Sequence, residues 1–196
     1  SYRETITAAN SVDKVPVGEW ATVTYTEDEH NVVRLYINGT KVAEGVHTTG
    51  LADLCERDVS GDVNIGRNII WGDKATDGTI RSLKVYDYAL YAAAATPTST
   101  SQPVAYYTFD DGDLTDRSGN GYTATLAGEE AVTFVDEEGH GKVLELNNSG
   151  KKRDNGASGI AIPAEVLAGK SAATILVDAY VYNINAHNVW LDISKG

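Results

Sequence analysis

The chain is poor in the residues that would build a disulfide framework or a membrane span. Its 196 residues include a single cysteine, Cys55, so neither an intramolecular disulfide nor a thiolate metal site can form. We expect Cys55 to pack as a small apolar residue. No apolar run approaches the roughly 20 residues that a bilayer-spanning helix needs, and the sequence therefore predicts no membrane insertion.

Positive charge is also scarce. The chain carries 16 Lys and Arg against 28 Asp and Glu, which gives a formal net charge of −12. Nucleic acids and anionic membranes are polyanions that bind basic surfaces, so this charge argues against both as partners. No signal peptide opens the sequence, and Ser1 and Gly196 both interrupt patterned stretches. We therefore expect a segment of a longer protein.

Alternation of apolar and polar residues predicts β-strands along nearly the whole chain. Ala21, Val23 and Tyr25 fall on one face of a strand with threonines on the other, and Asn38-Gly39 supplies a two-residue hairpin turn. Further strands are predicted at residues 33–37, 41–43, 63–65, 80–86, 104–109, 131–135, 143–146, 159–162, 173–182 and 189–193. Helical patterning is confined to residues 91–95 and 164–168, so we predict an all-β fold.

Several short motifs carry a family resemblance. Residues 106–112 (YYTFDDG), 116–121 (DRSGNG) and 141–146 (GKVLEL) resemble the opening strands of the laminin-G-like, concanavalin A-like lectin family. Residues 18–23 (GEWATV) and 35–39 (LYING) resemble its later strands. The resemblance implies a jelly-roll β-sandwich of two antiparallel sheets, of the kind repeated in large secreted bacterial proteins.

The two halves of the family pattern occur in reversed order. Residues 1–95 resemble the C-terminal half, residues 104–196 resemble the N-terminal half, and residues 96–103 form a Pro- and Ser-containing linker. The chain either straddles two tandem repeats or forms one sandwich in permuted order. No strand is duplicated, and half a sandwich would expose long unpaired edges. We therefore predict one circularly permuted composite sandwich over residues 1–196, present as a monomer or a strand-swapped dimer.

One loop is a candidate metal site. It contains Asp110, Asp113, Asp116 and Asn120 among several glycines, and Ca²⁺ takes about six to eight oxygen ligands. The resemblance implies a structural calcium ion here. The alternative is a plain cluster of turn-forming residues, because Arg81 follows the isoleucine where the family commonly has an acidic residue.

Catalytic patterns are missing. The glutamate and aspartate pattern E-x-D-x-x-E of glucanases with this architecture does not occur, the four histidines form no local metal pair, and no serine or cysteine lies in a nucleophile motif. The sequence therefore predicts that the chain is not an enzyme.

Binding is the favoured function. Trp71 lies in a glycine-containing loop with Asn68 and Asp73, where an aromatic face and polar groups suit a sugar ring, and His187 lies in a second loop. Trp20 lies inside an alternating strand and is expected in the core. We predict a non-catalytic, lectin-like accessory module of a secreted bacterial enzyme or adhesin, extracellular or at the cell surface, which binds a glycan or cell-surface polysaccharide. The alternative is a structural or protein-interaction spacer without a glycan site.

Overall fold

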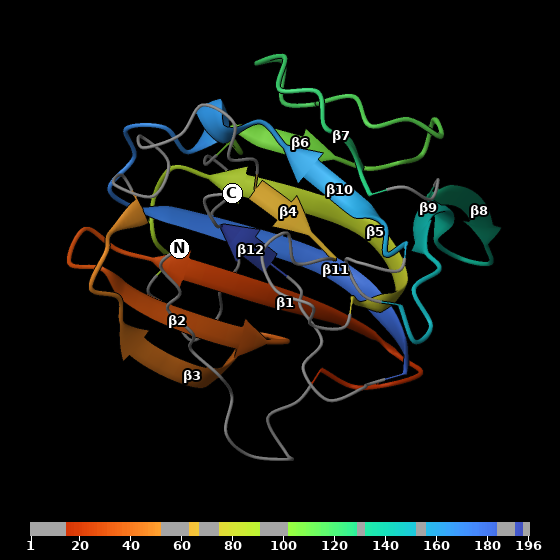
Figure 1. The fold of residues 1–196 in the computed structure, drawn as a ribbon, viewed down its shortest axis with the longest axis horizontal. Coiled ribbons are helices and arrows are strands. Elements are labelled where there is room, and N and C mark those ends of the chain that lie inside the picture. The colour runs from red at the N-terminus through yellow and green to blue at the C-terminus, as the bar shows by residue number, and fades with distance from the viewer. Residues whose placement is uncertain are drawn as a thin grey trace.

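Two antiparallel sheets pack face to face (Figure 1). The computed structural model describes residues 15–51, 63–66, 75–90, 102–128, 132–151, 156–183 and 191–193. The large sheet has the order β3-β2-β1-β11-β5-β9-β8, with β6 also paired to β5, and the small sheet has the order β12-β4-β10-β7. Within the described ranges, no helix is long and apolar enough to cross a membrane.

The predicted all-β sandwich is confirmed. The strands of the large sheet are β1 (Trp20–Glu27), β2 (Val32–Ile37), β3 (Thr40–Val46), β5 (Asp77–Tyr86), β6 (Ala105–Tyr107), β8 (Thr133–Glu137), β9 (Gly141–Leu146) and β11 (Ala173–Asn183). Those of the small sheet are β4 (Val63–Ile65), β7 (Thr125–Ala127), β10 (Gly159–Ile162) and β12 (Leu191–Ile193). The segment expected to be helical at residues 164–168 contains a 3₁₀ turn, Ala164–Val166.

Both sheets contain strands from the two halves of the chain. In the large sheet β11 lies between β1 and β5, with Ala21 opposite Ala179 and Val85 opposite Ile175. In the small sheet β4 lies between β10 and β12. Residues 1–14 lie outside the described ranges, so the pairing of residues 2–7 with residues 189–193 stays a prediction, as do the circular permutation and the domain boundaries.

The core forms where the inner faces of the two sheets meet. Ile175 and Val177 of β11 and Leu83 of β5 are almost fully buried, and Ile160 and Ile162 of the small sheet pack into the same cluster. Because successive side chains of a strand point to opposite faces, this inward set determines which residues of β11 and β5 face outward. The outward set carries most of the chemistry described below.

A two-residue hairpin joins β2 to β3 as the sequence predicted. Asn38 and Gly39 have φ angles of 50° and 77°, values that the left-handed turn residues of such a hairpin require. The Asn38 side-chain oxygen also accepts a hydrogen bond from the backbone N–H of Thr22 at 2.9 Å. The turn therefore sets the register of the edge hairpin against β1.

Candidate functional site

The outer face of the large sheet contains a shallow polar pocket. Its volume is about 380 Å³, near the lower end of the range of ligand pockets, about 300–1,000 Å³. It combines side chains of β5, β6 and β11 with the segment after β6 and the β8–β9 hairpin. The lining residues are Arg81, Ser82, Lys84, Tyr106, Thr108, Asp110, His140 and Asp178.

A register irregularity places Arg81 in this pocket. Asp178 pairs with Ser82 and the next residue, Ala179, pairs with Ile80, so Arg81 is the extra residue of β5. An extra residue of this kind bends the strand and redirects a side chain. The inward position belongs to Ile80, which is 1% exposed, and the guanidinium of Arg81 reaches the lining residues of the outer face.

Arg81 links two strands and a hairpin through its guanidinium. Its Nε donates to Asp178 Oδ2 at 2.8 Å, and its Nη2 donates to the same oxygen. Its Nη1 lies 2.6 Å from Nδ1 of His140. Arginine has donors only, so Nδ1 of His140 must be the acceptor.

Trp20 lies on the outer face, and the expectation that it packs in the core is wrong. It stands opposite Tyr180 on β11, its ring centroid is 4.8 Å from that of His140, and the Arg81 guanidinium lies 5.2 Å from the Trp20 ring centroid. Its Nε1 donates to Glu137 Oε1 at 3.1 Å. The physical reason is the strand period: with Ala21 inward, Trp20 must face outward.

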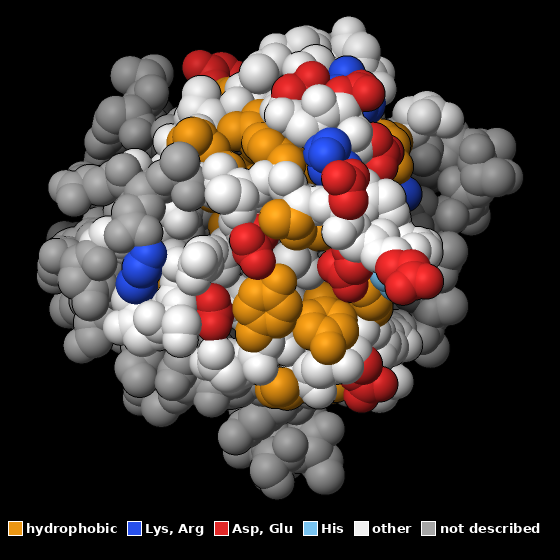
Figure 2. Space-filling model, turned by 90° about the vertical axis from the view of Figure 1, so that its right-hand side faces the viewer, with side chains coloured by type: hydrophobic (Ala, Val, Ile, Leu, Met, Phe, Trp, Pro, Cys, Tyr) orange, Lys and Arg blue, Asp and Glu red, His pale blue; other side chains and the backbone are white. Residues whose placement is uncertain are grey.

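Aromatic rings continue from Trp20 along β11. The ring centroids of Trp20 and Tyr180 are 5.9 Å apart, as are those of Tyr180 and Tyr182. Tyr182 is 42% exposed, and its hydroxyl donates to Glu145 Oε1 at 3.1 Å. Burial and then the charge of Glu145 raise the pKa of Tyr182 to about 12. Figure 2 views the molecule from the right of Figure 1 and shows hydrophobic and acidic side chains next to one another on this face.

A second cation lies at the other end of the pocket. Lys84 Nζ is 4.8 Å from the ring centroid of Tyr106, a geometry in which the ring attracts the ammonium group. Burial and then the charge of Asp110 raise the pKa of Tyr106. Asp110 is exposed and lines the pocket. Lys84 and Asp110 therefore place opposite charges near the same ring.

The predicted calcium ligand Asp116 has another role in the structure. It is 7% exposed, and its carboxylate accepts from the backbone N–H groups of Tyr106 (2.9 Å), Ser118 (2.8 Å) and Tyr122 (3.0 Å) and from the Ser118 hydroxyl (2.8 Å). Burial alone would raise the pKa of Asp116, but these hydrogen bonds outweigh it and the pKa is lowered. Four donors fill the acceptor sites of a carboxylate, so Asp116 fixes the loop against β6.

Other residues of this loop also have partners within the protein. Arg117 Nη2 lies 2.8 Å from both Asp111 Oδ2 and Asp113 Oδ1, so a guanidinium lies between these carboxylates. The Asn120 amide donates to Val104 O at 2.9 Å. Asp110 points instead to the pocket. Calcium stays a prediction of the sequence, and the donor set of this loop favours the alternative of a hydrogen-bonded turn.

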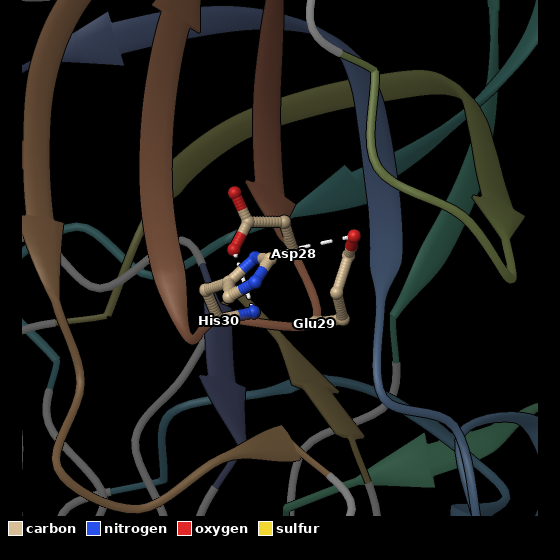
Figure 3. Close-up of side chains that lie close together, drawn as sticks. All are labelled: Asp28, Glu29 and His30. Carbon is tan, nitrogen blue, oxygen red and sulfur yellow. Dashed lines mark hydrogen bonds and ion pairs between the residues drawn. The ribbon is translucent and has the colours of Figure 1, made fainter.

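Another acidic group, Asp28, Glu29 and His30, brings three potential metal ligands within 4.8 Å of one another (Figure 3). Asp28 Oδ1 accepts from the backbone N–H groups of His30 (2.9 Å) and Val32 (3.0 Å), and Asp28 Oδ2 lies 2.9 Å from Nη1 of Arg34. Burial alone would raise the pKa of Asp28, but the hydrogen bonds from Arg34 and from the backbone outweigh it, and the pKa is lowered. These contacts explain the group as the turn between β1 and β2.

The loop residues predicted to bind a sugar lie outside the described ranges. Residues 67–74 contain Asn68, Trp71 and Asp73, and residues 184–190 contain His187. Their roles stay predictions. The sequence analysis missed the outer-face pocket, although one signal was present: Arg81 was recognised only as a departure from the usual acidic residue.

The described part of the chain is an all-β sandwich with a polar pocket and neighbouring aromatic residues on its outer face. Residues 2–96 match the family model of the concanavalin A-like lectin/glucanases superfamily. The resemblance inferred from the motifs is thereby confirmed for this part of the chain. Comparison with curated proteins finds no match. At the level of the superfamily, residues 2–96 are similar to carbohydrate-binding or structural modules.

Proposed function

We propose that this chain is a non-catalytic carbohydrate-binding module that binds its glycan on the outer face of the large sheet. The observation that carries the proposal is the row of aromatic rings that leads from the pocket to the exposed Tyr182. The Trp20 ring lies 5.2 Å from the Arg81 guanidinium, and the row continues through Tyr180 to Tyr182. A sugar ring has an apolar face that packs on aromatic rings, and its hydroxyls bond to charged planar groups. Tyr182 supplies the first kind of contact, and Asp178 with Arg81 supplies the second.

A hydrolytic role is disfavoured by the pocket chemistry. Glycoside hydrolysis needs two carboxyl groups about 5 to 9.5 Å apart across the scissile bond. Of the two lining carboxylates, Asp178 is bonded to Arg81 through Nε and Nη2. Among the lining carboxylates, Asp110 is thus the one without an ion-pair partner in the described residues, and Asp178 is held by the Arg81 guanidinium. The family resemblance further supports placing the module in a secreted or cell-surface bacterial protein, as part of a larger enzyme or adhesin.

Glycan binding by the chain and by matched variants tests the proposal. An array followed by titration calorimetry should identify a bound oligosaccharide, and Tyr182→Ala and Asp178→Asn should each weaken it at least tenfold. The controls lie on β3, far from the pocket in the sheet order: Val46→Ala removes an apolar side chain that is 68% exposed, and Glu44→Gln removes a carboxylate paired with Arg34. Both controls should bind as the parent does.

The competing role as a structural or protein-interaction spacer predicts a different result. A spacer would bind no glycan on the array at millimolar ligand, while its melting curve showed a folded chain. Binding that survives both Tyr182→Ala and Asp178→Asn would instead place the glycan elsewhere, and the loop containing Trp71 would be the next candidate.

A further inference from the structure

We infer that the ligand of the outer-face pocket is a neutral glycan, rather than one rich in uronic acids or free amino sugars. This inference rests on the proposed carbohydrate-binding function and names the ligand class of the same site. It follows from the charge balance of the lining residues, from which of their donors and acceptors are already engaged, and from the charges around the pocket.

The charges that line the pocket are balanced. Arg81 and Lys84 are cations, and Asp110 and Asp178 are anions. A site for an anionic sugar needs an excess of donors, and a site for a cationic sugar needs an excess of acceptors. Here neither sign dominates, so neither kind of charged ring gains from the pocket as a whole.

Arg81 is not available as an anion-binding group. Its Nε and Nη2 are bonded to Asp178 Oδ2, and its Nη1 is bonded to His140. A ligand carboxylate that approached Arg81 would also approach Asp178, and two like charges repel strongly at contact distance. The remaining N–H groups of Arg81 can still donate to a neutral hydroxyl, because a hydroxyl has no charge to be repelled.

Two carboxylates remain open for hydroxyl donors. Both bonds from Arg81 go to Oδ2 of Asp178, so Oδ1 makes no hydrogen bond within the described residues. Asp110 likewise makes none with a described residue, and it lies in the same pocket as Lys84. A sugar hydroxyl both donates and accepts, so one sugar can satisfy an Asp110 oxygen and the Lys84 ammonium together.

The surroundings of the pocket are acidic and disfavour an acidic glycan. Glu137 and Glu145 bond to Trp20 and Tyr182 beside the pocket, and the chain as a whole carries a net charge of −12. This field repels an acidic polysaccharide before contact. An amino sugar would be attracted at long range, but within the pocket its ammonium group would meet two cations as well as two carboxylates and would gain no net charge pairing there. A neutral ring meets neither repulsion.

Matched oligosaccharides test the inference on the complete chain. The array should hold oligomers of glucose, galactose and mannose, each with uronic-acid and amino-sugar counterparts of the same linkage. We expect the best neutral oligomer to bind at least tenfold more tightly than either charged counterpart. Its affinity should change less than twofold between about 0.05 and 0.5 M salt, because screening acts on charge pairs and leaves neutral contacts unchanged.

Charge variants give a second, opposite-signed readout. Asp110→Asn leaves the two cations in excess, so it should weaken neutral binding and strengthen the uronic-acid oligomer several-fold. Lys84→Met should shift the preference toward the amino-sugar oligomer. Asp111→Asn is the control: this neighbour changes the net charge equally, but its side chain is 71% exposed, is paired with Arg117 and does not line the pocket. The control should bind as the parent does.

The possible outcomes separate the inference from the function. If a charged oligomer binds most tightly, and Tyr182→Ala and Asp178→Asn both weaken its binding, the proposed function stands and the neutral ligand class is overturned. No binding of any oligomer would overturn both. The chain could also prefer neutral oligomers and keep this preference unchanged in both Asp110→Asn and Asp111→Asn. That result would overturn the inference, because the lining charges would then not select the ligand.

Discussion

Replacing Asp116 by alanine should lower the free energy of unfolding by about 3 kcal/mol. The change leaves three backbone N–H groups without their acceptor, while the Ser118 hydroxyl keeps Val104 O as an acceptor at 3.0 Å. A buried donor left unpaired costs about 1–3 kcal/mol, and donors to a charged group lie toward the upper end. Water can enter beside this loop, so we expect about 3 kcal/mol rather than the full sum. Stabilities of 5–15 kcal/mol are typical, so the variant should still fold.

Urea unfolding as a function of pH is the appropriate assay. The pKa of Asp116 is lowered in the folded chain, so the unfolded state binds the proton first as the pH falls. The stabilising contribution is complete above the unfolded pKa of about 3.9. It is lost as the pH falls through the lower folded pKa. The difference between the parent and Asp116→Ala should therefore be constant near pH 7 and shrink below about pH 4.

A control variant separates the effect of losing a buried, hydrogen-bonded carboxylate from the effect of losing one negative charge. Asp111→Asn removes a nearby carboxylate that is 71% exposed and should change the free energy of unfolding by less than about 0.5 kcal/mol. A loss under about 1 kcal/mol in Asp116→Ala, or a loss that is unchanged at pH 3, would refute the reasoning that this carboxylate fixes the loop.

The remaining predictions concern metal, packing, the second site and assembly. EDTA and added Ca²⁺ should leave the melting temperature unchanged if the loop donors are satisfied as described, whereas a drop with EDTA that calcium reverses would restore the calcium prediction. Gly78→Ala should lower the free energy of unfolding by about 1–3 kcal/mol, because its Cβ would lie 2.2 Å from the backbone oxygen of Tyr180, and wild-type urea stability would contradict this. From the sequence prediction that its loop binds the sugar, Trp71→Ala should abolish glycan binding without unfolding the chain, and unchanged binding would remove Trp71 from the site. In solution scattering, a radius of gyration of about 16 Å is expected for a compact monomer of this length, and a much larger value with dimer mass would indicate strand swapping.

The fold could be predicted because its signals are local. The hairpin at Asn38-Gly39 needs only two residues with positive φ, and the alternation around Ala21 follows from the strand period. Applied strictly, the same period would also have placed Trp20 outward. A place inside a strand does not decide the face, and Trp20 is the outward neighbour of the inward-facing Ala21.

The pocket could not be predicted because its residues meet only through long-range pairing. Arg81 and Asp178 are 97 residues apart in sequence, and the contact depends on a register irregularity that no local pattern announces. The role of Asp116 was missed for a related reason. A cluster of aspartates reads the same whether a metal or backbone N–H groups satisfy it, and only the fold shows that Tyr106 and Tyr122 supply the donors.

Amide chemical-shift mapping by NMR, with the oligosaccharide identified on the array, tests the central claim most directly. The account predicts that the largest shifts on titration cluster in β5 near Arg81, in β11 near Tyr182, and in residues 106–110. The edge hairpin β2–β3 should stay unchanged. Shifts confined to residues 67–74 or to the β2–β3 hairpin, with the signals of β5 and β11 unmoved at saturating glycan, would contradict it.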